Sequence, residues 1–270
     1  MFLEISGIKK SFGTGNSRVE VLKGIDLEIE KGEFCVLLGP SGSGKSTLIS
    51  LVPRLYDVTE GKVTIDGVDV RNITKESLRR QIGYVPQKNV LFSGTIASNL
   101  LYGFEADPKD VQKEMQENNL SEEEAVSKLA DISMKKAAQI AQATEFINEK
   151  PEQYDSAIAQ SGGNVSGGQK QRLAIARALV KKCPIYIFDD SFSALDFKTD
   201  AQLRKALKSE TTNATVLIVA QRVGTIMGAD QIIVLDEGKI AGIGTHRELL
   251  QNCQVYADIA HSQLSEEELA

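Results

Sequence analysis

The sequence predicts an α/β fold with a mostly parallel core sheet, an N-terminal antiparallel β-layer and an inserted α-helical subdomain. Three observations lead to it: short, fully apolar runs, an N-terminal stretch that alternates apolar and polar residues, and an Ala-, Glu-, Gln- and Lys-rich middle segment. Buried strands that alternate with helices are typical of parallel α/β sheets. We expect one domain over residues 1–270, in which 1–88 and 183–270 form the core and 89–182 the helical subdomain.

Composition excludes several classes of protein. The chain has 270 residues, of which 41% are hydrophobic and 25% charged, and its net charge is −6. An acidic chain is unsuited to a general nucleic-acid surface, so we expect no nucleic-acid partner. No apolar run approaches the ~18 residues of a membrane span, and the first residues do not resemble a secretory signal. Cys35, Cys183 and Cys253 lack metal-site spacing, which favours reduced thiols in a reducing cytosolic setting.

The first thirty residues alternate in polarity, which predicts an antiparallel β-layer with one solvated face. Residues 13–17 are rich in Gly and polar residues and predict a turn between its halves. Farther on, Glu60-Gly61 and Asp66-Gly67 are hairpin signals on either side of a short strand, 62–65. Residues 82–87 predict another short strand, which ends in Gln87.

A glycine-rich loop that fits G-x-x-x-x-G-K-[S/T] at Gly39, Gly44, Lys45 and Ser46 follows the apolar run Phe34–Leu38. The pattern G-x-x-x-x-G-K-[S/T] needs a buried strand before it and a helix after it, and both are expected here. Backbone N–H groups of such a loop point at one anion, and the helix N-terminus adds further donors. Lys45 can reach β- and γ-phosphates, and the Ser46 hydroxyl can ligate Mg²⁺. The alternative is an ordinary Gly/Ser turn. The predicted nucleotide-binding residues are Gly39, Pro40, Ser41, Gly42, Ser43, Gly44, Lys45, Ser46 and Thr47.

The middle segment predicts helices. Residues 107–129 carry many charges, which is typical of a solvated helical face, and Ser121 with Glu124 forms a capping box. After the glycine-rich stretch 161–168, apolar spacing predicts a helix over 169–180.

Two carboxylates end a central strand predicted at 185–190. Asp189 is placed to hold Mg²⁺, directly or through water, and Asp190 stands where a general base would lie. The alternative is that both side chains merely cap the strand in solvent. A further central strand is predicted at 215–220, a hairpin over 232–243, and a helical tail from Thr245.

Several motifs together resemble the ABC-type ATPases, over essentially the whole chain. Asn164–Arg172 is similar to their L-S-G-G-Q signature, with Val165 in place of Leu, and Ser193–Asp196 is similar to their D-loop. Gln87 resembles the Q-loop glutamine, and Phe12 the aromatic residue that stacks on adenine.

The resemblance implies a P-loop nucleotide-binding domain that pairs head to tail with a second such domain, of the same or a different chain, around two ATP molecules. It implies that Gln87 joins Ser46 and Asp189 near Mg²⁺, and that Lys45, Asp190 and Gln221 serve catalysis. The signature would contact the γ-phosphate bound by the partner domain through Ser166, Gly167, Gly168 and Gln169.

Two residues depart from the family pattern. The usual residue after the strand aspartate is Glu, and Asp190 is shorter by ~1.5 Å. The usual switch residue is His, whereas Gln221 cannot titrate near neutral pH. A well-placed general base contributes typically ~10²–10⁴-fold, so we expect slow hydrolysis at this chain's own site, as in degenerate halves of heterodimeric exporters. The alternative is that Asp190 still acts as a base in a homodimer.

The exporter branch of the family is resembled by the short stretches 54–57, 61–63, 78–79, 85–87 and 91–96, whereas residues 1–48 resemble stand-alone ATPase subunits. The mixture fits an excised domain, a separate subunit or a chimera. The expected function is the ATPase motor of a membrane exporter, bound to a transmembrane domain at the cytoplasmic face of the membrane. The alternatives are a nucleotide-gated module with little hydrolysis, a soluble ABC ATPase outside transport and, least favoured, a P-loop kinase.

Overall fold

A sheet of buried parallel strands forms the centre of the core. The computed structural model describes residues 2–265, and in it β3 (Phe34–Leu38), β9 (Ile185–Asp189) and β10 (Thr215–Val219) are buried along their whole length. Neighbouring strands are parallel, apart from the edge strand β12, which is antiparallel to β11. The order is β12-β11-β3-β10-β9-β6, with β6 at Ile82–Val85, β11 at Gln231–Asp236 and β12 at Lys239–Gly244. The apolar runs therefore became strands covered on both faces, as predicted.

The N-terminal residues form the expected antiparallel layer. Its strand order is β2-β1-β4-β5, and all its pairings are antiparallel. Leu22, Ile25 and Leu27 of β2 are buried, whereas the polar residues between them are exposed, so one face of the layer packs inward. The strands are β1 (Leu3–Phe12), β2 (Val19–Ile29), β4 (Glu60–Ile65) and β5 (Val68–Asp69).

One expected turn proved to be part of a strand. Glu60 and Gly61 belong to β4, although they were predicted to form a hairpin turn. The pairing of β1 with β4 shifts register between Ser6 and Lys9, and Gly61 lies there with φ +85°. A Cβ at Gly61 would collide with the carbonyl oxygen of Ser6. This glycine therefore allows two backbones to approach at a bulge, which is the other common use of glycine in strands.

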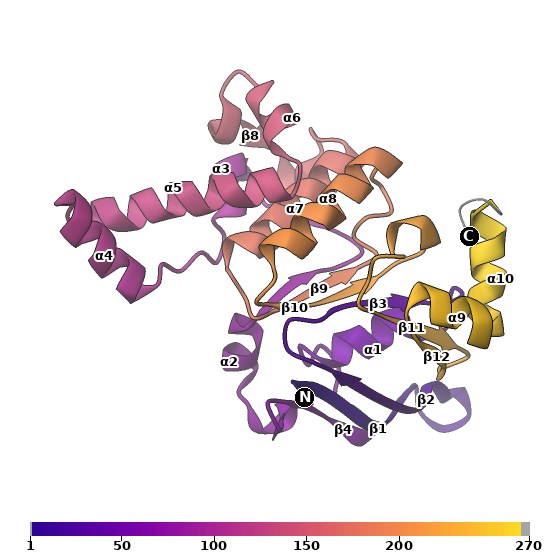
Figure 1. Ribbon diagram of the computed structural model, residues 1–270. Helices are drawn as coiled ribbons and strands as arrows, with labels where there is room; N and C mark the ends of the chain where they lie inside the picture. Colours follow the sequence, from indigo (N-terminus) through magenta and orange to yellow (C-terminus); the bar gives the residue numbers. More distant parts are fainter. Residues whose placement is uncertain (1, 266–270) are drawn as a thin grey trace. The chain divides into compact units, whose positions relative to one another are not determined.

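Helix α1 (Lys45–Leu51) lies between the two sheets of the core (Figure 1). It contacts β2 of the antiparallel layer and β9 and β10 of the parallel sheet. Leu48, Ile49 and Leu51 are buried and belong to the main apolar cluster. The helix therefore ties the two sheets together through one apolar core. The two sheets and α1 belong to the first of two compact units, which contains the described residues of 1–87, 183–193 and 211–270. Its other helices are α2 (Lys75–Arg80), α9 (His246–Asn252) and α10 (Gln254–Gln263).

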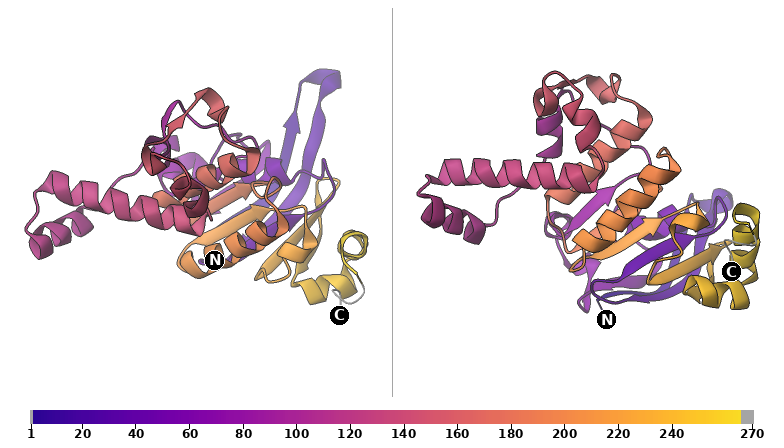
Figure 2. Two further views of the ribbon diagram at one scale, coloured as in Figure 1. Left: turned by 90° about the horizontal axis from the view of Figure 1, so that it is seen from above. Right: turned by 45° about the horizontal axis from the view of Figure 1, so that its top comes forward.

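A second compact unit contains most of the helices. It consists of residues Lys88–Lys182 and Ala194–Glu210. Within it, α4 folds back beside the start of α5 (Figure 2), where Lys128 and Glu114 form an ion pair of 2.7 Å. The capping box of Ser121 and Glu124 begins α5 as predicted. The helices are α3 (Ile96–Leu100), α4 (Pro108–Asn118), α5 (Glu122–Ile140), α6 (Thr144–Asn148), α7 (Gly167–Val180) and α8 (Phe197–Glu210), with a short ladder of β7 (Gly94–Thr95) and β8 (Ala157–Ile158).

Two boundaries differ from expectation. Helix α7 begins at Gly167 rather than Gln169, because Ser166 caps it: the Ser166 hydroxyl accepts from the Gln169 N–H at 3.2 Å. Helix α8, which the sequence analysis assigned to the core, groups with the helical unit. It packs against α5, and Lys136 of α5 pairs with Glu210 at 2.8 Å.

Among the helices of residues 2–265, none combines the length and the apolar character needed to cross a membrane.

The buried centre of β3 should govern stability. We expect Leu37→Ala, at a fully buried position, to lower the free energy of unfolding by ~2–5 kcal/mol, because the loss of apolar burial adds to a cavity. Leu55→Ala is the matched control, since Leu55 is 43% exposed; its effect should stay within ~0.5 kcal/mol. Denaturant unfolding measures both, and equal losses would contradict this account of the core.

Candidate nucleotide-binding site

The loop between β3 and α1 surrounds a buried lysine. Lys45 is 9% exposed, and its Nζ donates to the carbonyl oxygens of Gly39 at 2.8 Å and Pro40 at 2.7 Å and to the Ser43 hydroxyl at 3.2 Å. Burial lowers the pKa of Lys45, and the charges of Asp190 and Asp189 oppose this shift. The Lys45 Nζ thus lies among loop oxygens, at the centre of a loop whose type binds anions.

The same loop depends on close backbone contacts with other strands. A Cβ at Gly39, where φ is +148°, would collide with the Leu235 carbonyl of β11. Behind the loop, the Gly238 N–H donates to the Ser43 carbonyl at 3.2 Å. Gly44 caps α1 with φ +100°, where a Cβ would lie 2.7 Å from a methyl group of Leu22. The glycines of the motif therefore serve packing as well as phosphate access.

Two oxygen groups meet at the start of α1. The Ser46 hydroxyl donates to Asp189 Oδ1 at 2.7 Å. Burial raises the pKa of the Asp189 carboxyl, and the Ser46 hydrogen bond and the Lys45 charge act against this rise. Hydroxyl and carboxylate oxygens are ligands that Mg²⁺ accepts, usually with phosphate oxygens and water completing the shell. Within residues 2–265 no group of three or more His, Cys, Asp or Glu side chains could hold a metal, so these two fit a shared protein–phosphate site rather than a protein cage.

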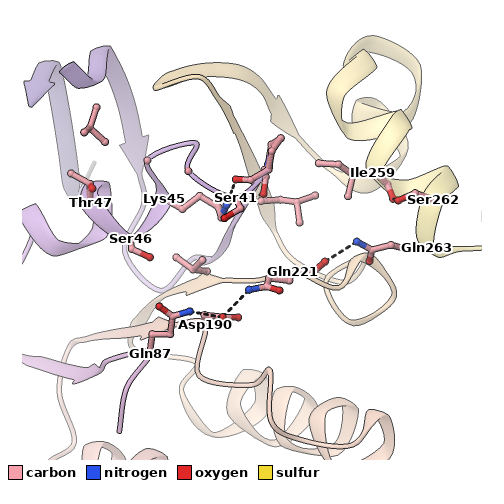
Figure 3. Close-up of a pocket in the computed structure, with 17 residues that line it drawn as sticks. Ser41, Lys45, Ser46, Thr47, Gln87, Asp190, Gln221, Ile259, Ser262 and Gln263 are labelled. Carbon is pink, nitrogen blue, oxygen red and sulfur yellow. Dashed lines mark hydrogen bonds between the residues drawn. The ribbon is translucent and has the colours of Figure 1, made fainter. Parts of the chain in front are cut away.

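Two amide groups converge on Asp190. Its Oδ2 accepts from Gln87 Nε2 at 3.0 Å and from Gln221 Nε2 at 2.8 Å (Figure 3). Asp190 itself is 7% exposed and has φ +48°, a conformation that Asp tolerates better than most residues. Side chains that follow β6, β9 and β10 are thereby brought together by neighbouring parallel strands.

These residues line a cavity of about 750 Å³, a size typical of small-molecule sites. The residues that line this cavity all belong to the first compact unit. Of the predicted residues it is lined by Gly39, Pro40, Ser41, Gly42, Gly44, Lys45, Ser46, Thr47, Gln87, Asp190 and Gln221. Ser43 and Asp189 lie behind this lining, where they contact Lys45 and Ser46. The signature residues Ser166, Gly167, Gly168 and Gln169 begin α7 in the other unit.

Phe12 is not brought to this cavity. Its ring lies edge-on to Tyr56, with centroids 5.2 Å apart, and the Lys10 ammonium lies 4.9 Å from its centroid. This placement does not support the expected stacking of Phe12 on adenine. Val21 of the neighbouring strand β2 lines the cavity instead. The sequence could not have favoured Val21 over Phe12, because their positions depend on how β1 pairs with β2.

Sequence reasoning missed the contribution of α10. Ile259, Ser262 and Gln263 line the cavity, and the Gln263 side chain contacts the loop after β10. The sequence indicated a helical tail but carried no motif there, so nothing pointed to a position beside the phosphate loop.

Backbone contact at Gly39 should be testable by stability alone. Gly39→Ala and Gly42→Ala both place a side chain at positive φ, but a Cβ at Gly42 meets nothing within 4 Å. We expect Gly39→Ala to lose ~1–3 kcal/mol more in unfolding free energy than Gly42→Ala, because the carbonyl of Leu235 cannot swing aside. Denaturant titration compares them, and equal losses would rule out the proposed collision.

The matching family model is described as ABC transporter and covers residues 22–193. An uncharacterized ABC transporter ATP-binding protein of Mycobacterium tuberculosis is 45% identical over 90% of this chain and 38% of its own length. A putative multidrug export ATP-binding/permease protein of Staphylococcus aureus is 42% identical over 91% of this chain and 39% of its own. An ATP-dependent lipid A-core flippase of Desulfotalea psychrophila is 39% identical over 92% of this chain.

A solved structure agrees with these relatives. A bacterial Atm1-family ABC exporter with ATP bound superposes with a TM-score of 0.81 at 35% identity, over 98% of this chain and 42% of that one. The chain thus spans about two fifths of the length of the relatives it matches. Its fold is that of the ABC-type ATPases, as the motifs predicted, and this chain belongs to the ABC transporter family.

Proposed function

We propose that this chain is the ATP-binding and ATP-hydrolysing motor domain of an exporter, and that it works at the cytoplasmic face of a membrane with a transmembrane domain. The observation that carries the proposal is the Lys45-centred loop, with the Ser46–Asp189 pair beside it, at the wall of a nucleotide-sized cavity. The relatives whose names describe export or flipping support the transport direction.

In this proposal the chain's own residues bind the nucleotide, orient the attacking water and accept its proton. The loop N–H groups and Lys45 would hold the β- and γ-phosphates, and Ser46 and Asp189 would hold Mg²⁺, which would neutralise charge on the phosphates. Asp190 orients the attacking water and accepts its proton, while the Gln221 amide donates toward the site. A second domain, of the same or another chain, closes over the γ-phosphate with its Ser166–Gln169 element or its equivalent, through donors at a helix N-terminus.

Slow turnover is the second part of the proposal. Both amides donate to the same Asp190 oxygen, so a water molecule that approaches this oxygen must compete with them. Gln221 can donate a hydrogen bond but cannot take up a proton near neutral pH. These contacts also favour the second candidate, a nucleotide-gated module that scarcely hydrolyses ATP.

Restoring the family residues should accelerate hydrolysis. We expect Asp190→Glu combined with Gln221→His to raise the turnover number for MgATP by ~10²-fold, because Glu extends the reach of the carboxylate and His can exchange a proton near neutral pH. Steady-state phosphate release measures this, with Lys45→Ala as the variant that should lose ATP affinity. If the unaltered chain already matches the double variant, Asp190 and Gln221 do not limit its hydrolysis.

Asp189→Asn should separate stability from metal binding. Burial raises the pKa of Asp189 above the ordinary 3.8, so its charged form favours the unfolded state, and Asn should raise the Tm at pH 7. That advantage should vanish as the pH falls below 3.8, since both folded and unfolded wild-type chains then carry the proton. Calorimetry at several pH values measures the Tm, and MgATP titration should show weaker Mg²⁺-dependent binding. A lower Tm at pH 7 would contradict the burial argument.

A further inference from the structure

Gln263, in the last turn of α10, uses both ends of its amide on one loop. Its Oε1 accepts from the Val223 N–H at 2.8 Å, and its Nε2 donates to the Gln221 carbonyl at 2.8 Å. The side chain thereby binds a backbone donor and a backbone acceptor two residues apart, which is how a neighbouring strand would bind them.

This loop lies just beyond the end of the sheet. Strand β10 ends at Val219, and the Ala220 N–H still donates to the Leu37 carbonyl of β3 at 3.1 Å. From Gln221 the chain leaves the sheet and enters the 3₁₀ turn Val223–Thr225. Backbone groups at such a point need partners from elsewhere, and Gln263 supplies two of them.

The helix that carries Gln263 is itself firmly anchored. Tyr256 and Ala260 of α10 are fully buried, and the Tyr256 hydroxyl lies 2.6 Å from His246 Nδ1 of α9. Residues 256, 260 and 263 share one helical face. The anchored turns therefore hold Gln263 at a fixed place beside the loop.

Gln221 links this contact to the reacting end of the site. Its carbonyl accepts from Gln263, and its own side-chain amide donates to Asp190 Oδ2 at 2.8 Å (Figure 3). We infer that Gln263 is a positioning residue: it fixes the backbone of residues 221–223 so that the Gln221 amide is directed at Asp190. The part of the inference that concerns turnover rests on the proposed function, whereas the restraint on the loop does not.

The variants follow from the two hydrogen bonds. Gln263→Met keeps the length of the side chain and removes both bonds. Gln263→Glu keeps an acceptor for the Val223 N–H but loses the donor to the Gln221 carbonyl. Gln254→Met is the control, because Gln254 lies exposed on the same helix, where its side chain donates to exposed Asp258 at 2.7 Å.

The first measurement is independent of hydrolysis. Amide hydrogen exchange by NMR on the 270-residue chain should show Val223 exchanging ~10-fold faster in Gln263→Met, and close to wild type in Gln263→Glu and Gln254→Met. The Gln221 side-chain amide signal, assigned by its loss in Gln221→Ala, should move toward the position of a free amide in Gln263→Met. If the exchange of Val223 and the Gln221 signal are both unchanged in Gln263→Met, the inference is wrong.

The second measurement is turnover. Gln263→Met should lower kcat for MgATP ~10-fold, with KM within about twofold of wild type, because the loop orients a reacting group rather than binding the nucleotide. In a Gln221→Ala background the same substitution should add nothing, since residues that act through one another are not additive. An additive loss would show a merely structural role and overturn the inference. If the unaltered chain shows no turnover at all, the proposed function fails and the exchange and amide measurements alone decide the inference.

Discussion

The contact on which the site depends is that between the Lys45 ammonium and the main-chain oxygens of its own loop. An ammonium ion is costly to bury unless donors meet acceptors on every side, and here Gly39, Pro40 and Ser43 provide them. These contacts hold the main chain of the loop around the lysine. Ser46 follows Lys45 at the start of α1, and Asp189 accepts from it at the end of β9.

Parallel strands explain why distant residues meet. Gln87, Asp190 and Gln221 each follow a strand of one sheet, and β6, β9 and β10 lie side by side in it. The carboxyl ends of parallel strands share an edge, which is where α/β proteins commonly bind ligands. The same arrangement brings two amides to one carboxylate oxygen, because Asp190 accepts from Gln87 and Gln221 at once. The proposal of slow turnover rests on this sharing.

Local signals predicted most of the fold and much of the site. The run before Gly39, the loop glycines and the helix after Lys45 obey short-range rules, so the strand, loop and helix could be read directly. The role of Gly61 could not be predicted in this way, because glycine is common both in turns and at bulges. Only the pairing with β1 shows that Gly61 lies at a bulge. The same holds for the cavity lining, which includes Val21 but not Phe12, because the pairing of β1 with β2 decides where each lies. It also holds for α8, whose place in the helical unit depends on packing against α5. The place of Gln263 depends on how α10 packs, and no sequence pattern encodes that.

The close approach of Gly39 to Leu235 has a consequence for the order of events during synthesis. Strand β11 pairs with β3 through residues almost two hundred positions apart, and α10 emerges later still. Contacts between such distant positions form slowly and only once both partners exist. A ribosome that has made the loop and its lysine has therefore not yet made the cavity, which is complete only after β11 and α10 have left the exit tunnel.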